Sequence, residues 1–339
     1  MQQNGQSKWV KARLFIFCLV VLVAAIALVR IYYSLTDDFR EANIQYNYPM
    51  KFAEKWKTED PSELELERLK GLLKQPYIYI GKGAQSYAFK SQDGQYVIKF
   101  FKFKHLKPSW WIDWLPSIPY IKEYREAVRN RKEKKLIGVF DAYHLAYQKD
   151  RDAAELIYLH LSPTTYLKQT VQLEDKLGLI HSIDLDQTVF LLQRKGEAFR
   201  SRLEHLINEE NWIRAEESIA AILSMYVDEY EKGLYDRDHG VMQNTGFVGE
   251  KPFHLDVGKI SEDPRIKNKE IYKKDLALVA WKIDYWIKQQ YPRDISERFT
   301  KAILSMYSKL AGDTFDPDAI TYQNFKKHRG FLESQRTMP

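Results

Sequence analysis

The pattern of apolar and polar positions along the 339-residue chain changes character twice. An unbroken apolar run, LFIFCLVVLVAAIALV, covers residues 14–29. Between residues 76 and 194 short alternating segments predict strands, with one long helical segment among them. Beyond residue 196 the apolar residues recur mostly at helical spacing. Because strands and helices fall into separate halves, we predict an α+β protein rather than alternating βαβ units.

The strand-rich half begins with a hairpin pattern. The segment YIYIGKGAQSYAFK at 77–90 predicts a strand, a glycine turn and a second strand. A Ser-Gln-Asp-Gly turn at 91–94 leads into a third strand, QYVIKFFKF. Residues 120–152 predict a helix with an apolar stripe that includes Leu136 and Tyr143. Further strands are predicted at 156–161, 169–175 and 188–194, and later helices at 201–210, 212–233, 271–290 and 294–311.

The N-terminal apolar run has the composition of a membrane-spanning helix. Its 16 residues span about 24 Å as an α-helix, which is short of the roughly 30 Å hydrocarbon core. Arg13 and Arg30 can extend their side chains to the headgroups, and Tyr33 lies at an aromatic boundary. We therefore predict a single-pass transmembrane helix over 14–33 that contacts the lipid bilayer, preceded by a basic tail at 1–13.

The sequence is compatible with two processing outcomes for this segment, and it gives an indication of its orientation in the membrane. Ala25-Ile26-Ala27 offers a small-x-small cleavage site, so a cleaved signal peptide is the alternative to an anchor. The basic residues before the run favour a cytoplasmic N-terminus by the positive-inside rule, with the folded part on the other side.

Most of the net charge of +6 comes from the N-terminus. Lys8, Lys11, Arg13 and Arg30 precede the first acidic residue, Asp37, and the rest of the chain has 48 Lys and Arg against 46 Asp and Glu. Since the folded part is nearly neutral, we expect no nucleic-acid partner. The single cysteine lies in the apolar run, which excludes a disulfide framework and a cysteine-based metal site.

Two segments of the strand-rich half are suited to contact phosphate groups. Gly81 and Gly83 lie in a turn between two predicted strands, where backbone N–H groups can approach phosphate oxygens. A strand rather than a helix follows the turn, which argues against a dinucleotide fingerprint and a Walker loop. Lys99 lies among apolar residues of the next strand, so its amine faces either solvent or the α- and β-phosphates of a nucleotide.

Two acidic segments in the helix-rich half complete the candidate chemistry. The segment GLYDRDHGVMQN places Asp238 six residues before Asn244. A carboxylate there can accept the proton of an attacking hydroxyl, and an amide oxygen can hold magnesium. Asp256-Val257-Gly258 follows a short apolar stretch, where a carboxylate can bind the metal that bridges β- and γ-phosphates.

Together and in this order, these segments resemble the protein-kinase-like superfamily over about residues 76–310. The turn is similar to Gly-x-Gly-x-x-Ser, Val97-Ile98-Lys99 to the Val-Ala-Ile-Lys strand, and Asp256-Val257-Gly258 to the Asp-Phe-Gly element. The resemblance implies a bilobal kinase-like fold and the cofactors ATP and Mg²⁺. Its implied divisions are a juxtamembrane linker and helix at 34–75, an N-lobe at 76–195 and a C-lobe at 196–339.

The resemblance also implies a role for each candidate residue. Asp238 and Lys99 correspond to catalytic residues, and Asn244 and Asp256 to metal ligands. The last N-lobe strand leads into a hinge whose backbone holds adenine. The residues implied in cofactor binding are Gly81, Gly83, Ser86, Lys99, Gln193, Lys195 and a glutamate that pairs with the lysine, Glu133 or Glu126.

The helix partner of Lys99 stays open between these two glutamates. Glu133 is preferred because it lies on the same helix face as Leu136, and Glu126 is the alternative. Asp275, on a later predicted helix, resembles the buried aspartate that steadies the catalytic loop in kinase-like proteins.

The chain also departs from the common kinase pattern. Asp238 and Asn244 are six residues apart where the usual pattern has five, and Asp236 stands where histidine is usual. No Ala-Pro-Glu segment follows, and only about a dozen residues separate Asp256 from the next predicted helix. These departures favour the aminoglycoside-phosphotransferase-like or lipopolysaccharide-kinase-like branches over peptide-phosphorylating kinases.

We therefore expect a membrane-anchored phosphotransferase that moves the γ-phosphate of ATP to a hydroxyl-bearing acceptor, which the sequence does not identify. The alternative is a pseudokinase, a catalytically inactive nucleotide-binding or scaffold domain tethered to the membrane. ATP chemistry favours a cytoplasmic site or a nucleotide-importing lumen, which conflicts with the positive-inside indication. The side of the membrane that holds the folded part stays open.

Overall fold

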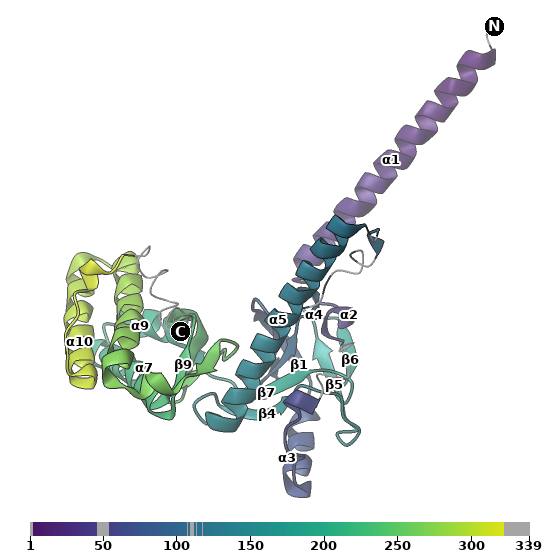
Figure 1. Cartoon of the computed structure of the whole chain (residues 1–339). Coiled ribbons are helices and arrows are strands. Elements are labelled where there is room, and N and C mark those ends of the chain that lie inside the picture. Colours follow the sequence, from purple (N-terminus) through teal and green to yellow (C-terminus); the bar gives the residue numbers. More distant parts are fainter. Residues whose placement is uncertain are drawn as a thin grey trace.

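The computed structural model describes residues 3–45, 54–106, 108, 112, 114–116 and 118–321 (Figure 1). Parts of the predicted basic tail, the juxtamembrane linker and the C-lobe lie outside the described residues, at 1–2, 46–53 and 322–339. The described residues form a strand-rich lobe, a helix-rich lobe and a long helix that leaves the strand-rich lobe (Figure 1). The α+β prediction is confirmed.

Helix α1 (Gln3–Leu35) begins inside the predicted basic tail and ends two residues beyond the predicted span. It contains a 23-residue apolar stretch, Arg13–Leu35, within which an 18-residue window has a mean hydropathy of 3.0 and is not buried against the rest of the chain. At 1.5 Å per residue this stretch is about 34 Å long, enough to cross a hydrocarbon core. By length and composition α1 is a candidate membrane span, and a signal sequence has the same two properties.

The strand-rich lobe is built on a seven-stranded sheet with the order β4-β7-β3-β2-β1-β5-β6. β1 and β5 run parallel, and the other neighbouring strands are antiparallel. Buried and less buried residues alternate along β2, as expected for a strand with a core on one face. The strands are β1 (Tyr77–Lys82), β2 (Ser86–Ser91), β3 (Tyr96–Phe101), β4 (Leu156–His160), β5 (Thr170–Glu174), β6 (Ile180–Asp184) and β7 (Phe190–Arg194).

The predicted strands include six of these seven, and β6 is the one that the hydrophobic pattern does not reveal. β6 pairs with β5 along its full length, with Thr170 opposite Asp184. Of its five residues only Ile183 is buried, so β6 carries almost no apolar alternation. Its place in the sheet depends on backbone pairing with β5 rather than on a buried face.

Both faces of the sheet are covered. Phe100 on one face belongs to a buried cluster with residues of α3 (Glu63–Leu73), whereas Phe101 on the other contacts Phe140 of α5 (Pro119–Lys149). The buried residues of α5 all lie from Leu136 onward, so its first half extends beyond this core. The short helices of this lobe are α2 (Glu41–Ile44), η2 (Glu54–Trp56) and α4 (Phe103–Leu106).

The helix-rich lobe packs its long helices around a second core that includes Tyr226, Ile283 and Phe299. These helices are α6 (Phe199–Asn208), α7 (Trp212–Lys232), α9 (Lys269–Gln290) and α10 (Arg293–Ala311). The segment of short elements between α7 and α9 contains Asp238, Asn244 and Asp256. The short elements of this lobe are β8 (Glu197–Ala198), β9 (Leu234–Asp236), α8 (Val241–Asn244), β10 (Thr245–Val248), β11 (Lys251–His254), β12 (Ile260–Glu262) and η4 (Pro264–Lys267), and η5 (Pro317–Ala319) follows α10.

The chain passes from one lobe to the other at Gly196, between β7 and β8. A Cβ atom built on Gly196 would lie 2.3 Å from Phe253 Cε1 and 2.5 Å from the backbone oxygen of Phe247. Real Cβ atoms do not approach other atoms this closely, so any side chain here would displace β10 or β11. The connection therefore requires glycine for reasons of space.

We predict that Gly196→Ala lowers the free energy of unfolding by about 1–3 kcal/mol, because the neighbouring backbone and Phe253 must move. Gly71→Ala is the matched control: Gly71 lies within α3, and nothing lies within 4 Å of its Cβ position. The control should gain about 0.5–1 kcal/mol from the higher helix propensity of alanine. Urea unfolding of the purified chain in detergent, followed by circular dichroism, measures both variants, and equal stabilities would contradict the prediction.

Candidate active site

The glycine turn connects β1 to β2 and is closed by its own backbone. Gly81 pairs with Ala88 in the β1–β2 ladder, after a shift of register in β1. The N–H of Gly83 donates to the carbonyl of Ser86 over 2.9 Å. Lys102 Nζ, from the residue that follows β3, donates to the carbonyl of Gly83 over 2.7 Å. The turn is therefore fixed to the adjacent strands at both of its ends.

The tip of this turn lies close to the helix-rich lobe. A Cβ atom built on Gly258 would be 3.8 Å from Gln85 Oε1, which places the Gln85 side chain beside the Asp-Val-Gly segment. Among the described residues Gln85 Oε1 is buried without a hydrogen-bond partner. The glycine turn thus contributes an unused acceptor to the same region as Asp256.

Lys99 extends from β3 toward the same segment. Its Nζ donates a hydrogen bond to the backbone carbonyl of Leu255 in the helix-rich lobe. Burial lowers the pKa of Lys99 from its ordinary value, although the nearby Asp256 carboxylate opposes this shift. Lys99 and Asp256 come from different lobes, 157 residues apart in sequence, and interact electrostatically.

Asp256 is oriented by two donors on one carboxylate oxygen. Tyr143 Oη of α5 and the backbone N–H of Gly258 each donate to Asp256 Oδ1 over 2.9 Å. A Cβ atom at Gly258 would lie 3.1 Å from this same oxygen, so glycine allows the backbone to turn close to the carboxylate. The orientation of Asp256 therefore depends on a helix of the strand-rich lobe as well as on its own segment.

The α5 residue that contacts Asp256 is Tyr143, and the predicted pairing of Lys99 with a glutamate of α5 stays a prediction. The charge that acts on Lys99 is Asp256, and neither Glu133 nor Glu126 is among the contacts of Lys99 in the described residues. Glu133 precedes Tyr143 by ten residues, about 15 Å along the helix, and Glu126 lies further still. Tyr143, not either glutamate, is the α5 residue with a contact to the Asp-Val-Gly segment.

Asp238 and Asn244 lie next to each other and are connected to Asp256. Asn244 Nδ2 donates to Asp238 Oδ1 over 3.3 Å. The backbone carbonyl of Asn244 accepts the N–H groups of Leu255 and Asp256, over 2.6 and 3.3 Å. The catalytic-loop segment and the Asp-Val-Gly segment therefore form one hydrogen-bonded unit.

The six-residue spacing from Asp238 to Asn244 is accommodated by a compact loop that leads into α8. The N–H of Gly240 donates to Asp238 Oδ1 over 3.0 Å and to Asp236 Oδ2 over 3.1 Å. Asp236 Oδ1 also accepts the N–H of Asp238 over 3.1 Å. Asp236, noted as a departure from the kinase pattern, is buried and shapes this loop through the backbone.

His239 is held by the aspartate that resembles the loop-steadying residue of kinase-like proteins. Its Nε2 lies 2.7 Å from Asp275 Oδ1, and Tyr230 Oη donates to Asp275 Oδ2 over 2.7 Å. Burial alone would lower the pKa of His239, but the Asp275 carboxylate raises it above its ordinary value. His239 has a left-handed backbone with φ of 50°, so this contact stabilises a strained residue directly after Asp238.

The two predicted hinge residues have different roles in the structure. Gln193 is buried in β7, and its Nε2 donates to the carbonyls of Ala154 and His254 over 2.6 and 2.7 Å. The backbone N–H of Lys195 donates to the carbonyl of Gln95 over 2.8 Å. The Gln193 side chain therefore connects the lobes rather than facing a nucleotide. Because the Lys195 N–H already donates to Gln95, the adenine base of a nucleotide would have to contact other backbone atoms of this connection.

A buried ion pair supports the strand that leads to Asp256. His254 Nε2 of β11 lies 2.5 Å from Glu229 Oε1 of α7, and both side chains are fully buried. Burial alone would lower the pKa of His254, but the Glu229 carboxylate raises it to about 9. The contact joins β11 to α7.

The donor set at Asp256 and Asn244 fits magnesium. In the part of the chain that the structure describes, no three His, Cys, Asp or Glu side chains are arranged to hold a metal ion. Mg²⁺ bound to a nucleotide does not need such a cluster, because one or two protein oxygens, phosphate oxygens and waters complete its shell. A carboxylate and an amide oxygen on two segments joined by backbone hydrogen bonds meet that requirement.

Three residues of this site have no assigned function in the sequence prediction: Gln85, Tyr143 and His239. Tyr143 is visible in the sequence only as one member of an apolar stripe, and its hydroxyl contact with Asp256 is a long-range feature. His239 stands between Asp238 and Gly240 in the candidate loop, but nothing local indicates its contact with Asp275.

A separate cavity of about 770 Å³ lies between α3, the C-terminal end of α5 and β4. Its lining includes Arg68, Tyr147 and Arg151 together with several carboxylates. None of the candidate site residues lines it, so we do not assign it to the candidate chemistry.

No protein-family model matches the chain, and no curated protein matches it. Among solved structures, the chain is similar to a crystal structure of WbdD, with 15% identity over 76% of this chain and a TM-score of 0.31. Another WbdD structure is titled as a bifunctional kinase-methyltransferase. The chain spans half the length of the WbdD chain that it matches.

Two further solved structures cover most of their own chains. One is the aminoglycoside phosphotransferase APH(3'')-Id from Streptomyces rimosus, with 12% identity, 79% of this chain, 96% of that chain and a TM-score of 0.33. The other is Rv3197 in complex with erythromycin from Mycobacterium tuberculosis, with 12% identity, 96% of this chain, 94% of that chain and a TM-score of 0.33. All of these TM-scores are below 0.5. The resemblance to a protein-kinase-like fold therefore remains based on the order of the chain's own motifs.

We predict that Gln193→Leu lowers the free energy of unfolding by about 2 kcal/mol, because it leaves two buried carbonyls without their donor. Gln289→Leu is the matched control, since Gln289 is exposed near the end of α9. Urea unfolding of the full chain in detergent measures both variants. A Gln193 variant as stable as the Gln289 control would show that the amide does not connect the lobes.

Proposed function

We propose that this chain is a membrane-anchored phosphotransferase that moves the γ-phosphate of ATP to a hydroxyl-bearing acceptor. The observation that carries the proposal is the meeting of Lys99 with the Leu255–Asp256 segment, across the two lobes. A lysine, two carboxylates and an amide within one hydrogen-bonded unit are the groups that phosphoryl transfer needs. Substrate positioning and charge stabilisation supply most of the catalysis in this reaction class.

In this proposal each residue has one role. Lys99 orients the α- and β-phosphates, and Asp256 and Asn244 hold Mg²⁺. The metal ion, when bound, neutralises the charge that develops on the phosphates. Asp238 accepts the proton of the attacking hydroxyl, and the Gly240 N–H and Asn244 Nδ2 keep its carboxylate oriented.

The alternative function is a pseudokinase that binds a nucleotide or a partner without turnover. Two observations favour it: Lys99 Nζ is bonded to a backbone carbonyl, and neither Glu133 nor Glu126 is among its contacts in the described residues. The occupied N–H of Lys195 adds to these departures. We favour the enzyme because Asp238, Asn244 and Asp256 are all present and connected.

The anchor in this proposal is α1, inserted in the bilayer through the predicted 14–33 segment. An ATP-dependent site requires the lobes to face the compartment that holds ATP. We therefore propose that the lobes lie on the cytoplasmic side of the membrane, against the positive-inside indication of the short N-terminal tail. We expect protease added to intact cells to leave the lobes uncut, and to cut them only after the membrane is opened.

We predict that the full chain in detergent binds ATP only with magnesium and turns it over, measured as a thermal shift and as ADP release. Asp256→Asn should lower turnover by about 10²–10³-fold, because it removes one electrostatic contact to the transition state. Asp294→Asn is the matched control, since Asp294 is exposed on α10, outside the site. Lys99→Met should also lower turnover.

The outcomes separate the two functions. Magnesium-dependent binding without ADP release, or no binding at all, supports the pseudokinase. Turnover that survives Asp256→Asn contradicts the assigned metal ligand and the proposed mechanism. Equal losses in the Asp256 and Asp294 variants would indicate a general effect on folding, which the unfolding temperature without nucleotide tests.

A further inference from the structure

The first half of α5 presents a face that the candidate active site does not use. Residues spaced three or four apart on a helix share one face. On one face of this half of α5, the side chains near the N-terminus are aromatic and those nearer the strand-rich lobe are basic. We call it the α5 face, and its members are Tyr120, Tyr124, Ala127, Arg131, Lys134 and Lys135. All six are exposed, Tyr120 to 82% and Tyr124 to 50%.

This half of the helix carries an excess of positive charge. Residues 119–135 contain seven Lys and Arg against three Asp and Glu, whereas the chain after the N-terminal segment is nearly neutral. Ile118, which directly precedes the helix, is 55% exposed, and Trp114 is 79% exposed. Exposed aromatic and apolar side chains at one end and basic side chains at the other are typical of segments that lie at a membrane surface.

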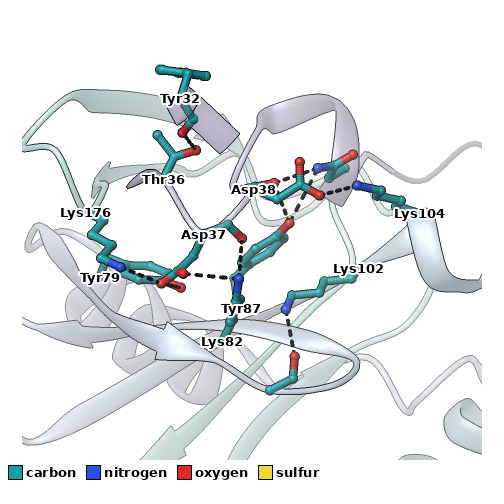
Figure 2. Close-up of polar contacts among 12 residues, drawn as sticks. Tyr32, Thr36, Asp37, Asp38, Tyr79, Lys82, Tyr87, Lys102, Lys104 and Lys176 are labelled. Carbon is teal, nitrogen blue, oxygen red and sulfur yellow. Dashed lines mark hydrogen bonds and ion pairs between the residues drawn. The ribbon is translucent and has the colours of Figure 1, made fainter. Parts of the chain in front are cut away.

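The end of α1 fixes where the membrane lies relative to the strand-rich lobe. Asp37 and Asp38 lie two and three residues after the end of α1, and both contact the strand-rich lobe (Figure 2). The Asp37 carboxylate pairs with Lys82 of β1 and with Lys176 over 3.1 and 3.2 Å, and accepts from Tyr79 Oη over 3.1 Å. The membrane end of α1 is therefore held against the sheet by side chains rather than joined to it by a free linker.

The segment that leads into α5 starts at this same junction. Asp38 also pairs with Lys104 of α4, which is shown in Figure 2, and its backbone carbonyl accepts from Tyr87 Oη over 2.6 Å. α4 contacts both α2 and α5. Figure 1 shows α1 and the N-terminal half of α5 extending from the same side of the strand-rich lobe.

The sheet surface at the junction is also basic. Lys82, Lys102, Lys104 and Lys176 gather there, and Asp37 and Asp38 are the acidic residues that face them in Figure 2. A bilayer into which α1 inserts thus meets a positively charged side of this lobe. Anionic headgroups are the complementary surface, since each Lys or Arg near an anionic leaflet contributes about 1 kcal/mol.

We propose that the α5 face docks on the anionic lipid headgroups of the leaflet next to Leu35, with Tyr120 and Tyr124 at the headgroup boundary and Arg131, Lys134 and Lys135 among the phosphates. The proposal rests on the membrane anchor of the proposed function and not on its catalysis. A cytoplasmic leaflet carries the negative surface potential that this face requires. Docking would hold α5, and with it Tyr143, in a fixed position relative to the membrane.

The test uses the full chain in lipid nanodiscs, with Cys18→Ala and one fluorescent reporter on a new cysteine. Ala127→Cys places the reporter within the α5 face, and Ser305→Cys places it on an exposed position of α10 as the matched control. Quenching by spin-labelled headgroups is measured in discs of phosphatidylcholine alone and in discs that also contain phosphatidylglycerol. We expect quenching at Ala127→Cys only in the anionic discs, loss of that quenching in high salt, and none at Ser305→Cys.

Charge variants test the chemistry of docking in the same discs. Lys134→Gln with Lys135→Gln should lower the docked-to-undocked ratio about five-fold per charge, or about 25-fold together. Lys301→Gln with Lys309→Gln removes the same charge from exposed positions of α10 and should leave the ratio unchanged. Unfolding temperatures of both pairs report whether either change affects the fold.

Each outcome decides the proposal. Equal quenching in neutral and anionic discs, or none in either, overturns docking on anionic headgroups even when the chain stays anchored. A chain that does not remain in discs of any composition contradicts the anchor itself, and with it both this inference and the membrane part of the proposed function. ADP release in detergent is independent of these results, so a failure of catalysis is distinguished from a failure of docking.

Discussion

The hydrogen bonds that hold the short segment between Leu255 and Gly258 determine whether the site exists. Lys99 of the sheet binds the Leu255 carbonyl from one side, and the Asn244 carbonyl accepts the N–H groups of Leu255 and Asp256 from the other. Tyr143 and the Gly258 N–H then orient the Asp256 carboxylate. Because both lobes contact the same few residues, any change in the angle between the lobes changes the position of this carboxylate.

Buried polar groups, rather than apolar packing, fix the loops around that segment. Asp275 holds His239, Asp236 accepts two backbone N–H groups, and the amide of Gln193 satisfies one carbonyl from each lobe. In a low-dielectric interior a satisfied polar contact specifies one geometry, because leaving either partner unpaired is costly. This explains how a site made mostly of turns and strands of three or four residues keeps a defined shape.

Local pattern is sufficient for the α+β fold class, and it indicates the candidate residues of the site, whose assignment stays a prediction. Alternation along β1–β3 and the spacing of Asp238, Asn244 and Asp256 are properties of neighbouring residues, so the sequence displays them directly. Helical periodicity identifies a face of α5 but not the turn that reaches the sheet, so it does not select a glutamate partner for Lys99. The contacts of Tyr143, Gln193 and His239 join segments far apart in the chain, and no local rule indicates them. The roles of the catalytic and metal-binding residues stay predictions.

The backbone directly after α1 has a consequence for how the whole chain encounters other molecules. Asp37 and Asp38 adopt left-handed φ angles of 54° and 64°. Within a few residues of the end of α1, the Asp37 carboxylate binds Lys82 of β1, the Asp38 carboxylate binds Lys104 of α4, and the Asp38 carbonyl accepts from Tyr87 of β2. A flexible linker would let the lobes sample a large volume, whereas this turn fixes their height above the lipid. For a chain inserted through α1, molecules that share the bilayer would therefore reach the lobes by lateral diffusion at a constant distance from the membrane. Dissolved molecules would meet lobes whose orientation relative to the membrane is fixed by this turn.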